Sequence, residues 1–305
     1  MKHVVSVSLG SSKRDKSIEA EFFGEKVLIE RLGVDGSLER YAQKLDELDG
    51  KVDAIGIGGM DVYLWANGKR YTFRDPMKLA SRLKITPWVD GSGLKNTLER
   101  ETVRRLDASG VEKWAGRRTL MVAGVDRFGM AEALHDAEAD LCMGDLMFAL
   151  GIPVPMRTWT GFQRMAAMLL PIVVNAPFKW LYPTGEKQES VRPKWPTWYS
   201  WAEIISGDYH LIRRFMPADL SGKTILTNTT TETDRGDLKA RGVKRLITTT
   251  PVFEGRSFGT NVLEAVLIVV AGKKPDAMKP EEYLEMLERL GWKPDVADLN
   301  AAPDA

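Results

Sequence analysis

Short apolar runs and one helical repeat organise the first part of the chain. The runs at 2–9 and 52–58 have the length of buried strands, whereas apolar residues within 38–48 recur at spacings of three and four. That spacing places them on one face of a helix. The pair Asn67-Gly68 separates two further short runs, which predicts a hairpin with a type I′ turn. Residues 1–100 are therefore predicted to form an α/β domain.

A more regular alternation of strands and helices begins after residue 118. The predicted strands are 119–125, 140–144, 203–207, 224–227 and 245–249, and the predicted helices are 128–137, 209–215, 233–241, 261–271 and 280–290. Alternation of this kind is typical of a parallel sheet with helices on both faces. A helix at 94–106 is the predicted link between domains. We expect a Rossmann-like domain at 101–275 with a helical insertion at about 146–200, followed by a helix and a frayed tail at 276–305.

Composition and charge remove several classes of function. The 305 residues carry 43 basic and 42 acidic side chains, a net charge of +1, so no strong field favours nucleic acid. The one cysteine, Cys142, cannot form an internal disulfide, which indicates a reducing, cytoplasmic setting. The apolar stretch 165–178 is shorter than the roughly 20 residues of a membrane span. With three histidines in the chain, no His-rich metal site is expected.

The strongest chemical motif lies between the first strand and helix of the second domain. It reads Gly124-Val-Asp126-Arg127-Phe128-Gly129, and a helix N-terminus at such a turn presents unpaired N–H groups to a pyrophosphate. Asp145 ends the next predicted strand, where a carboxylate accepts hydrogen bonds from the ribose of NAD. The sequence therefore predicts NAD as cofactor, with the motif residues and Asp145 binding it.

One residue of this motif conflicts with phosphate binding. Asp126 stands where the middle glycine of a dinucleotide fingerprint is expected, and its charge would repel a pyrophosphate. Arg127 could offset that charge. Asn228 and Thr229 follow a later strand, and their side chains could line the nicotinamide crevice or bind the N-terminus of the next helix.

A second candidate is the turn Asp90-Gly-Ser-Gly93 ahead of the linking helix. Asp90 could take a proton from a substrate hydroxyl while hydride leaves. It could equally cap the helix that follows. Both interpretations remain open at the level of sequence.

These features together resemble the shikimate/quinate 5-dehydrogenase family, of which the chain would be a distant, divergent member. The resemblance rests on Asp90-Gly-Ser-Gly93, the linking helix, the strand ending in Gly124 and the helix after Gly259-Thr-Asn261-Val-Leu-Glu264. It implies a substrate domain followed by a dinucleotide-binding domain, and reversible hydride transfer between NAD(P) and a ring hydroxyl. It also implies a catalytic role for Asp90 and substrate contacts from Asn261 or Glu264, with Ser8, Ser11 and Ser12 in place of the family's hydroxyl pair.

The chain departs from that family in the partner of the catalytic Asp. The family's Asn-x-Thr-x-Pro-x-x-Lys segment, which supplies the lysine partner of the Asp, is absent from this chain. Four lysines are candidates for that partner, and we predict that it is Lys95. The other three are Lys69, Lys78 and Lys84.

The sequence thus favours a cytoplasmic NAD-dependent dehydrogenase acting on a cyclic hydroxy acid, with a small-molecule substrate and no nucleic-acid partner. Three alternatives stay open: a non-catalytic NAD sensor, an aldehyde or acyl reductase that uses Cys142, and a phosphotransferase suggested by Leu9-Gly-Ser-Ser12. A homodimer is also left open.

Overall fold

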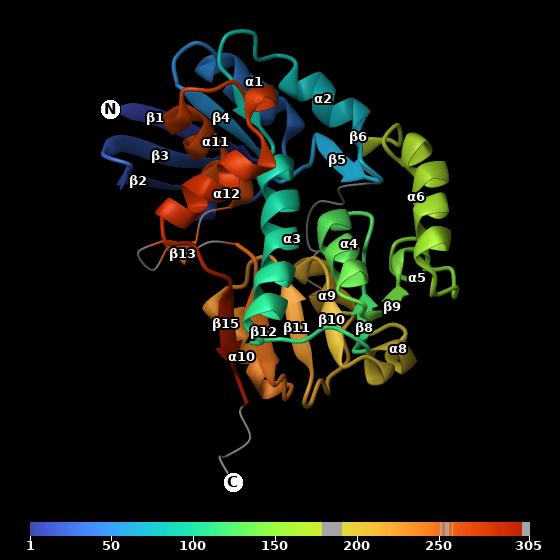
Figure 1. The fold of residues 1–305 in the computed structure, drawn as a ribbon. Coiled ribbons are helices and arrows are strands. Elements are labelled where there is room, and N and C mark those ends of the chain that lie inside the picture. Colours follow the sequence, from blue (N-terminus) through green and yellow to red (C-terminus); the bar gives the residue numbers. More distant parts are fainter. Residues whose placement is uncertain (179–190, 251, 254–255, 258, 301–305) are drawn as a thin grey trace. The chain divides into compact units, whose positions relative to one another are not determined.

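The chain forms two compact α/β units, as Figure 1 shows for the computed structural model. The structure describes residues 1–178, 191–250, 252–253, 256–257 and 259–300. The first unit combines 1–97, 170–185 and 258–292, and the second combines 98–169, 186–257 and 293–305. The predicted α/β class is confirmed. The domains expected from sequence are continuous segments, whereas each unit gathers three segments that lie far apart in the chain.

The first unit is built on a sheet of five strands in the order β2-β3-β1-β4-β7. Neighbouring strands are parallel except β2, which runs antiparallel to β3. The strands are β1 (Lys2–Ser8), β2 (Lys16–Phe22), β3 (Glu25–Gly33), β4 (Ala54–Gly58) and β7 (Trp88–Val89). A separate hairpin joins β5 (Tyr63–Ala66) to β6 (Lys69–Thr72). Asn67 and Gly68 both have positive φ, as a type I′ turn requires, so the predicted hairpin is confirmed.

Helices cover both faces of this sheet. They are η1 (Ser12–Arg14), α1 (Leu38–Leu48), α2 (Arg74–Ala80), α11 (Thr260–Ala271), η3 (Pro275–Ala277) and α12 (Pro280–Arg289). Val5 and Val7 of β1 pack with Tyr41 and Leu45 of α1. Ser6 points to the opposite face, where it bonds to Asn261 of α11. Helix α11 was expected within the segment 101–275, but it packs on β4 and β1 of the first unit (Figure 1).

The second unit contains a sheet of six strands in the order β15-β12-β11-β10-β8-β9. They are β8 (Arg118–Met121), β9 (Asp140–Met143), β10 (Ile204–Ser206), β11 (Thr224–Thr227), β12 (Arg245–Thr248) and β15 (Asp295–Asp298). All neighbours are parallel except β15, which pairs antiparallel with β12. The tail that the sequence predicted to fray therefore contributes an edge strand over 295–298, because its backbone pairs with β12.

The helices of this unit alternate with its strands. They are α4 (Phe128–Asp136), α5 (Asp145–Phe148), α8 (Pro196–Trp201), α9 (Tyr209–Phe215) and α10 (Glu232–Ala240). A short hairpin pairs β13 (Val252–Phe253) with β14 (Arg256–Ser257). Leu120, Cys142, Ile205, Ile225 and Leu246, one from each parallel strand, are buried in a common core. Because these residues share one core, the predicted strands form a single sheet and the helices pack against it.

Two long helices, α3 (Ser92–Ser109) and α6 (Trp159–Val173), contain residues of both units. Of the predicted insertion at 146–200, the structure describes the end of α5, helix α6 and helix α8, while 179–190 lie outside the described residues. Among the described helices, none has the length and apolar character needed to cross a membrane.

We expect Gly91→Ala to destabilise the protein more than Gly68→Ala. Both glycines have positive φ, which costs an alanine about 1–2 kcal/mol. A Cβ at Gly91 would also lie 2.6 Å from the backbone N of Asn261, whereas one at Gly68 meets nothing within 4 Å. Overpacking of this kind adds roughly 1–3 kcal/mol. Urea unfolding of both variants measures the difference, and equal losses would contradict the close approach of α11.

Candidate functional site

The strand order of the second unit defines where a ligand would bind. From β8 the chain moves to β9 at one edge, and then returns to β10 on the other side of β8. In open parallel sheets, ligands bind outside the carboxyl ends of the strands at such a reversal of strand order, the switch point. β8 ends at Met121 and β10 at Ser206, earlier than predicted, so residues 122–127 and 207–208 form the two loops at this point.

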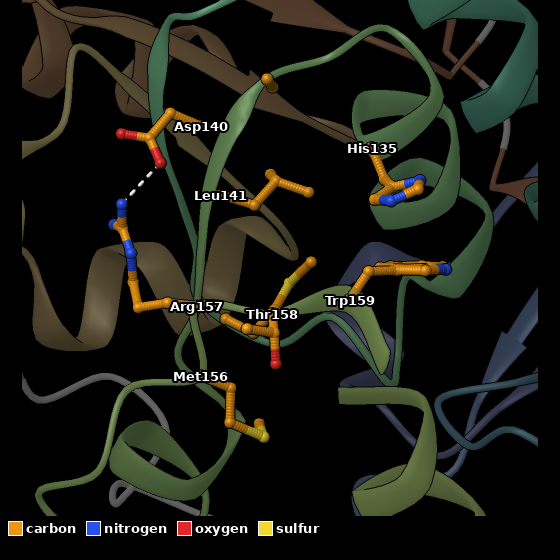
Figure 2. Close-up of a pocket in the computed structure, with 9 residues that line it drawn as sticks. His135, Asp140, Leu141, Met156, Arg157, Thr158 and Trp159 are labelled. Atoms are coloured by element: carbon orange, nitrogen blue, oxygen red, sulfur yellow. Dashed lines mark hydrogen bonds and ion pairs between the residues drawn. The ribbon is translucent and has the colours of Figure 1, made fainter. Parts of the chain in front are cut away.

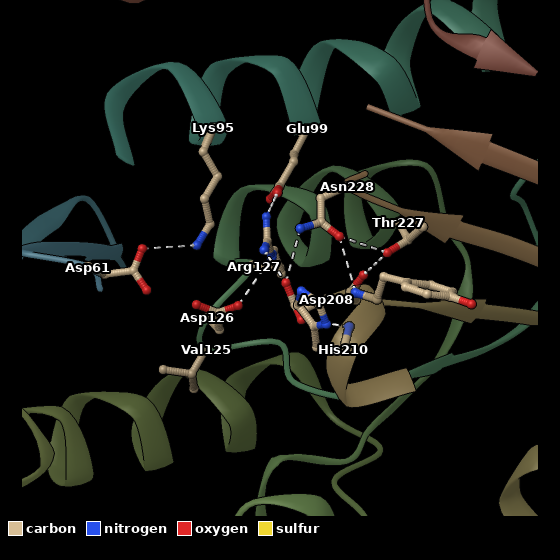
Figure 3. Close-up of polar contacts among 12 residues, drawn as sticks. Asp61, Lys95, Glu99, Val125, Asp126, Arg127, Asp208, His210, Thr227 and Asn228 are labelled. Carbon is tan, nitrogen blue, oxygen red and sulfur yellow. Dashed lines mark hydrogen bonds and ion pairs between the residues drawn. The ribbon is translucent and has the colours of Figure 1, made fainter. Parts of the chain in front are cut away.

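Arg127 is the centre of the switch point. Its guanidinium donates to Glu99 Oε1 at 2.5 Å, to Asp208 Oδ2 at 2.6 Å and to Asp126 Oδ2 at 3.1 Å (Figure 3). The side chains of Arg127 and Glu99 are only 7% and 2% exposed. Burial by itself would lower the pKa of Arg127, but the attraction of the three carboxylates outweighs it and raises that pKa well above its usual value. The arginine is therefore permanently charged.

Polar residues from two further strand ends extend this cluster. Asn228, which follows β11, donates from Nδ2 to Asp208 Oδ2 at 3.0 Å and accepts the backbone N–H of Tyr209 at 3.1 Å. Asp208 also caps α9 by accepting the N–H of His210. The exposed Thr229 bonds to Thr250 after β12 at 2.6 Å. The carboxyl ends of β8, β10, β11 and β12 thus carry a continuous set of polar side chains.

Asp145 occupies the turn that was expected to bind a pyrophosphate. Its carboxylate accepts the N–H groups of Gly124 at 3.1 Å and Val125 at 2.8 Å. Burial raises the pKa of Asp145 to about 6, although these two hydrogen bonds lower it. The structure therefore gives the N–H groups of the turn a carboxylate partner from the protein itself, in place of the phosphate and ribose contacts expected from the sequence.

The remaining residues of the motif belong to the core. A Cβ on Gly124 would lie 2.9 Å from the ring of Phe162, so the glycine makes room for a side chain of α6. Phe128 stacks on the same ring with centroids 5.6 Å apart, and Gly129 is buried in α4. These three residues have a packing role in the structure.

In the first unit, Asp90 joins the turn before α3 to the loop after β4. Its Oδ2 accepts the N–H groups of Val62 and Tyr63, each at 2.7 Å, and its Oδ1 accepts that of Ser92 at 3.0 Å. Lys95, the lysine predicted to pair with Asp90, has its Nζ 3.8 Å from Asp61 Oδ1. Of the two interpretations of Asp90, the structure matches the one in which it organises the start of the helix.

The serines expected to bind substrate build the turn after β1. Ser8 Oγ accepts from the N–H of Gly10 and from Arg31. Ser11 caps η1, and the N–H and hydroxyl of Ser12 both donate to Asp35. Each of these hydroxyls has a hydrogen-bond partner in the first unit, and for Ser12 that partner is Asp35, which follows β3.

Glu264 is buried against the start of α3. Its Oε1 accepts the hydroxyl of Tyr283 at 2.9 Å, and its Oε2 has no hydrogen-bond partner in the described part of the chain. Burial, together with the nearby charge of Asp90, raises the pKa of Glu264 to about 8, while the hydrogen bonds from Tyr283 and from the backbone of Gly91 and Leu94 lower it. Asn261, one turn earlier, bonds to Ser6. Both predicted substrate residues therefore fix α11 to its own unit.

The alternative of an aldehyde or acyl reductase needs a reactive thiol, and the environment of Cys142 does not make its thiol reactive. It is fully buried in β9, and burial raises the pKa of its thiol to about 11. At neutral pH it carries almost no thiolate, the nucleophilic form.

Sequence reasoning missed Glu99 and, in its role toward Arg127, Asp208. Glu99 is one of many charged residues in 94–106, and no local pattern distinguishes it. Asp208 follows a predicted strand, and the rule that ligands bind at the carboxyl ends of parallel strands was the signal that could have ranked it higher.

The fold and the site together define a two-unit α/β protein with a polar switch point. The model of a family described as a domain of unknown function (DUF8754) matches residues 93–299, so the chain belongs to that family. A second model, also described as a domain of unknown function (DUF8753), matches residues 3–90. The two matches meet at the turn that contains Asp90. No curated protein matches the chain.

Solved structures that align with the chain include binding proteins and dehydrogenases. A sugar ABC transport substrate-binding protein from Bordetella parapertussis 12822 aligns with 12% identity and a TM-score of 0.38, over 99% of this chain and 91% of its own. L-tryptophan dehydrogenase from Nostoc punctiforme aligns with 13% identity and a TM-score of 0.34, over 88% of this chain and 67% of its own. A 5,10-methylenetetrahydrofolate dehydrogenase from the silkworm Bombyx mori aligns with 11% identity and a TM-score of 0.32, over 95% and 88%. Scores of this size assign no function to the chain.

We expect Arg127→Met to lower the free energy of unfolding by roughly 3–5 kcal/mol, because it removes the guanidinium that pairs with the buried Glu99. Arg118→Met is the matched control. Arg118 is half exposed and pairs with Glu203 at the surface, so its loss costs at most about 1 kcal/mol. Chemical denaturation of both variants tests this, and equal losses would show that the cluster does not stabilise the fold.

Glu264 should make the protein less stable as the pH rises. A carboxyl whose pKa rises on folding from 4.5 to about 8 binds its proton more tightly in the folded state. Its stabilising contribution is complete below pH 4.5 and is lost as the pH rises to about 8. We expect Glu264→Gln to show a flatter dependence between about pH 6.5 and 8, where Asp145 contributes little. Parallel slopes for the two proteins would contradict the raised pKa.

Proposed function

We propose that the second unit binds a small polyhydroxylated molecule at the switch point between β8 and β10. The observation that carries this proposal is the buried Arg127, which holds Asp126 and Asp208 from two adjacent strand ends. The side chains of these aspartates are 31% and 16% exposed, so both reach the surface of the cluster. A carboxylate oxygen accepts more than one hydrogen bond, and sugar and cyclitol hydroxyls are suitable donors.

Asn228 completes this array with a side chain that can both donate and accept. It is partly buried and is already oriented by Tyr209 and Asp208. Binding then requires little reorganisation, because the protein's own hydrogen bonds hold the side chains in place. The charge of the cluster favours a ligand rich in hydroxyls over one with a pyrophosphate, because Asp126 belongs to the turn where phosphate oxygens would lie and Asp145 accepts the N–H groups of that turn.

The second candidate is NAD-dependent oxidation of a ring hydroxyl. The Rossmann-like strand order, the glycine turn ahead of α4 and an Asp at the end of β9 favour it. The turn as described does not fit the cofactor, because Asp145 already accepts the N–H groups of Gly124 and Val125. Dinucleotide binding would require Asp145 to leave those groups, so we derive no step of hydride transfer.

Titration of the full chain with two sets of ligands separates the candidates. Calorimetry with myo-inositol and ribose tests the polyhydroxyl site, and nicotinamide fluorescence with NADH and NADPH tests the dinucleotide site. We expect saturable binding in the first set. Asp208→Asn should weaken it about 10–100-fold, the value of hydrogen bonds to a charged group.

The control for this variant is Asp219→Asn, which makes the same change of charge on an exposed loop before β11. Its affinity should equal that of the wild type. Saturable binding of NADH with no binding in the first set would favour the dehydrogenase. An affinity for polyols that Asp208→Asn leaves unchanged would overturn the proposed site.

A further inference from the structure

A small pocket lies beside β9, and its lining includes His135, Arg157 and Trp159 (Figure 2). Its volume is about 130 Å³. For comparison, an engineered cavity of roughly 150 Å³ accommodates benzene. Arg127, at the switch point, precedes the first residue of α4, whereas His135, which lines the pocket, is in the last turn of that helix. The pocket and the switch point therefore lie at opposite ends of α4.

The pocket lies where the chain pairs with the free edge of β9 through a single pair of residues. Met143 and Met156 exchange backbone hydrogen bonds of 2.9 and 3.1 Å. The chain then turns into α6 at Trp159. Leu141, two residues before Met143, faces the same outer side of β9. Within the described residues its outward N–H and C=O have no strand partner, so they are available inside the pocket.

Arg157 forms one side of the pocket and is held in place. Its guanidinium donates to Asp140 at 2.5 Å and lies over the ring of Trp201, 4.3 Å from the centroid. The hydrogen bond to Asp140 uses Nη2, one of several N–H donors of the guanidinium. A planar, fixed guanidinium matches the two oxygens of a carboxylate.

The opposite side is formed by two stacked rings. The rings of His135 and Trp159 stack with centroids 4.6 Å apart and an interplanar angle of 23°. Ala139, Leu141, Met143, Met156 and Thr158 also line the pocket, and methionine side chains adapt readily to the shape of an apolar ligand. Figure 2 shows the aromatic pair and Arg157 on opposite sides of this space.

We propose that this pocket binds a small carboxylate anion with an apolar body of about one ring. Arg157 and the N–H of Leu141 bind the carboxylate, and the apolar body packs against the methionines and Trp159. Asp140 keeps Arg157 in position but does not use all of its donors. This second ligand site is independent of the function proposed for the switch point.

Calorimetric titration of the full chain with benzoate, and with benzamide as its neutral isostere, tests the proposal. We expect benzoate to bind at least about tenfold more tightly than benzamide, because a charge-assisted pair with Arg157 forms only with the anion. Arg157→Gln should remove that preference. Ala139→Leu, which places a larger side chain in the pocket and leaves Arg157 intact, should abolish binding of both compounds.

Arg164→Gln is the matched control, because it removes the same charge from an exposed position of α6. Its affinity for benzoate should equal that of the wild type. If Arg157→Gln fails to fold, Ala139→Leu still tests the site. Equal affinities of the wild type for benzoate and benzamide, no binding of benzoate, or benzoate binding that Ala139→Leu does not change would each overturn the proposal.

Discussion

The arrangement of the second unit depends on the ion pairs that the buried guanidinium of Arg127 makes with three carboxylates. A charge in that position is tolerated only when opposite charges surround it. Glu99, Asp126 and Asp208 supply them from helix α3, the turn after β8 and the loop after β10. Asn228 then ties Asp208 to the end of β11. Segments more than a hundred residues apart are fixed together at the point where the sheet topology would place a ligand.

At the switch point, a strand order typical of dinucleotide-binding domains is combined with different side chains. In a dinucleotide-binding domain, the turn after the first strand offers free N–H groups to phosphate. Here Asp145 accepts those N–H groups, and the surrounding side chains offer mainly carboxylate and amide oxygens. Strand order gives the location of the candidate site, and the side chains at that location present carboxylate and amide oxygens in place of free N–H groups.

In the first unit, residues that resembled a catalytic set have structural roles. Asp90, Asn261 and Glu264 connect the turn before α3, the helix α11 and the sheet. Gly56 and Gly91 permit this, because a Cβ on either would lie within 3 Å of Asn261. These contacts describe the structural role of the residues on which the resemblance to shikimate and quinate dehydrogenases rests, and the resemblance itself stays a prediction.

The sequence by itself determined most of the elements. Helices 38–48 and 209–215 and strand 224–227 have the bounds that their apolar patterns predicted, because local periodicity reports directly which face of an element is buried. Only the tertiary structure decided the partners of the charged residues. Glu99 pairs with Arg127, Asp145 binds the turn at Gly124, and 295–298 join β12, because these contacts depend on distance in space and leave no periodic trace in the chain.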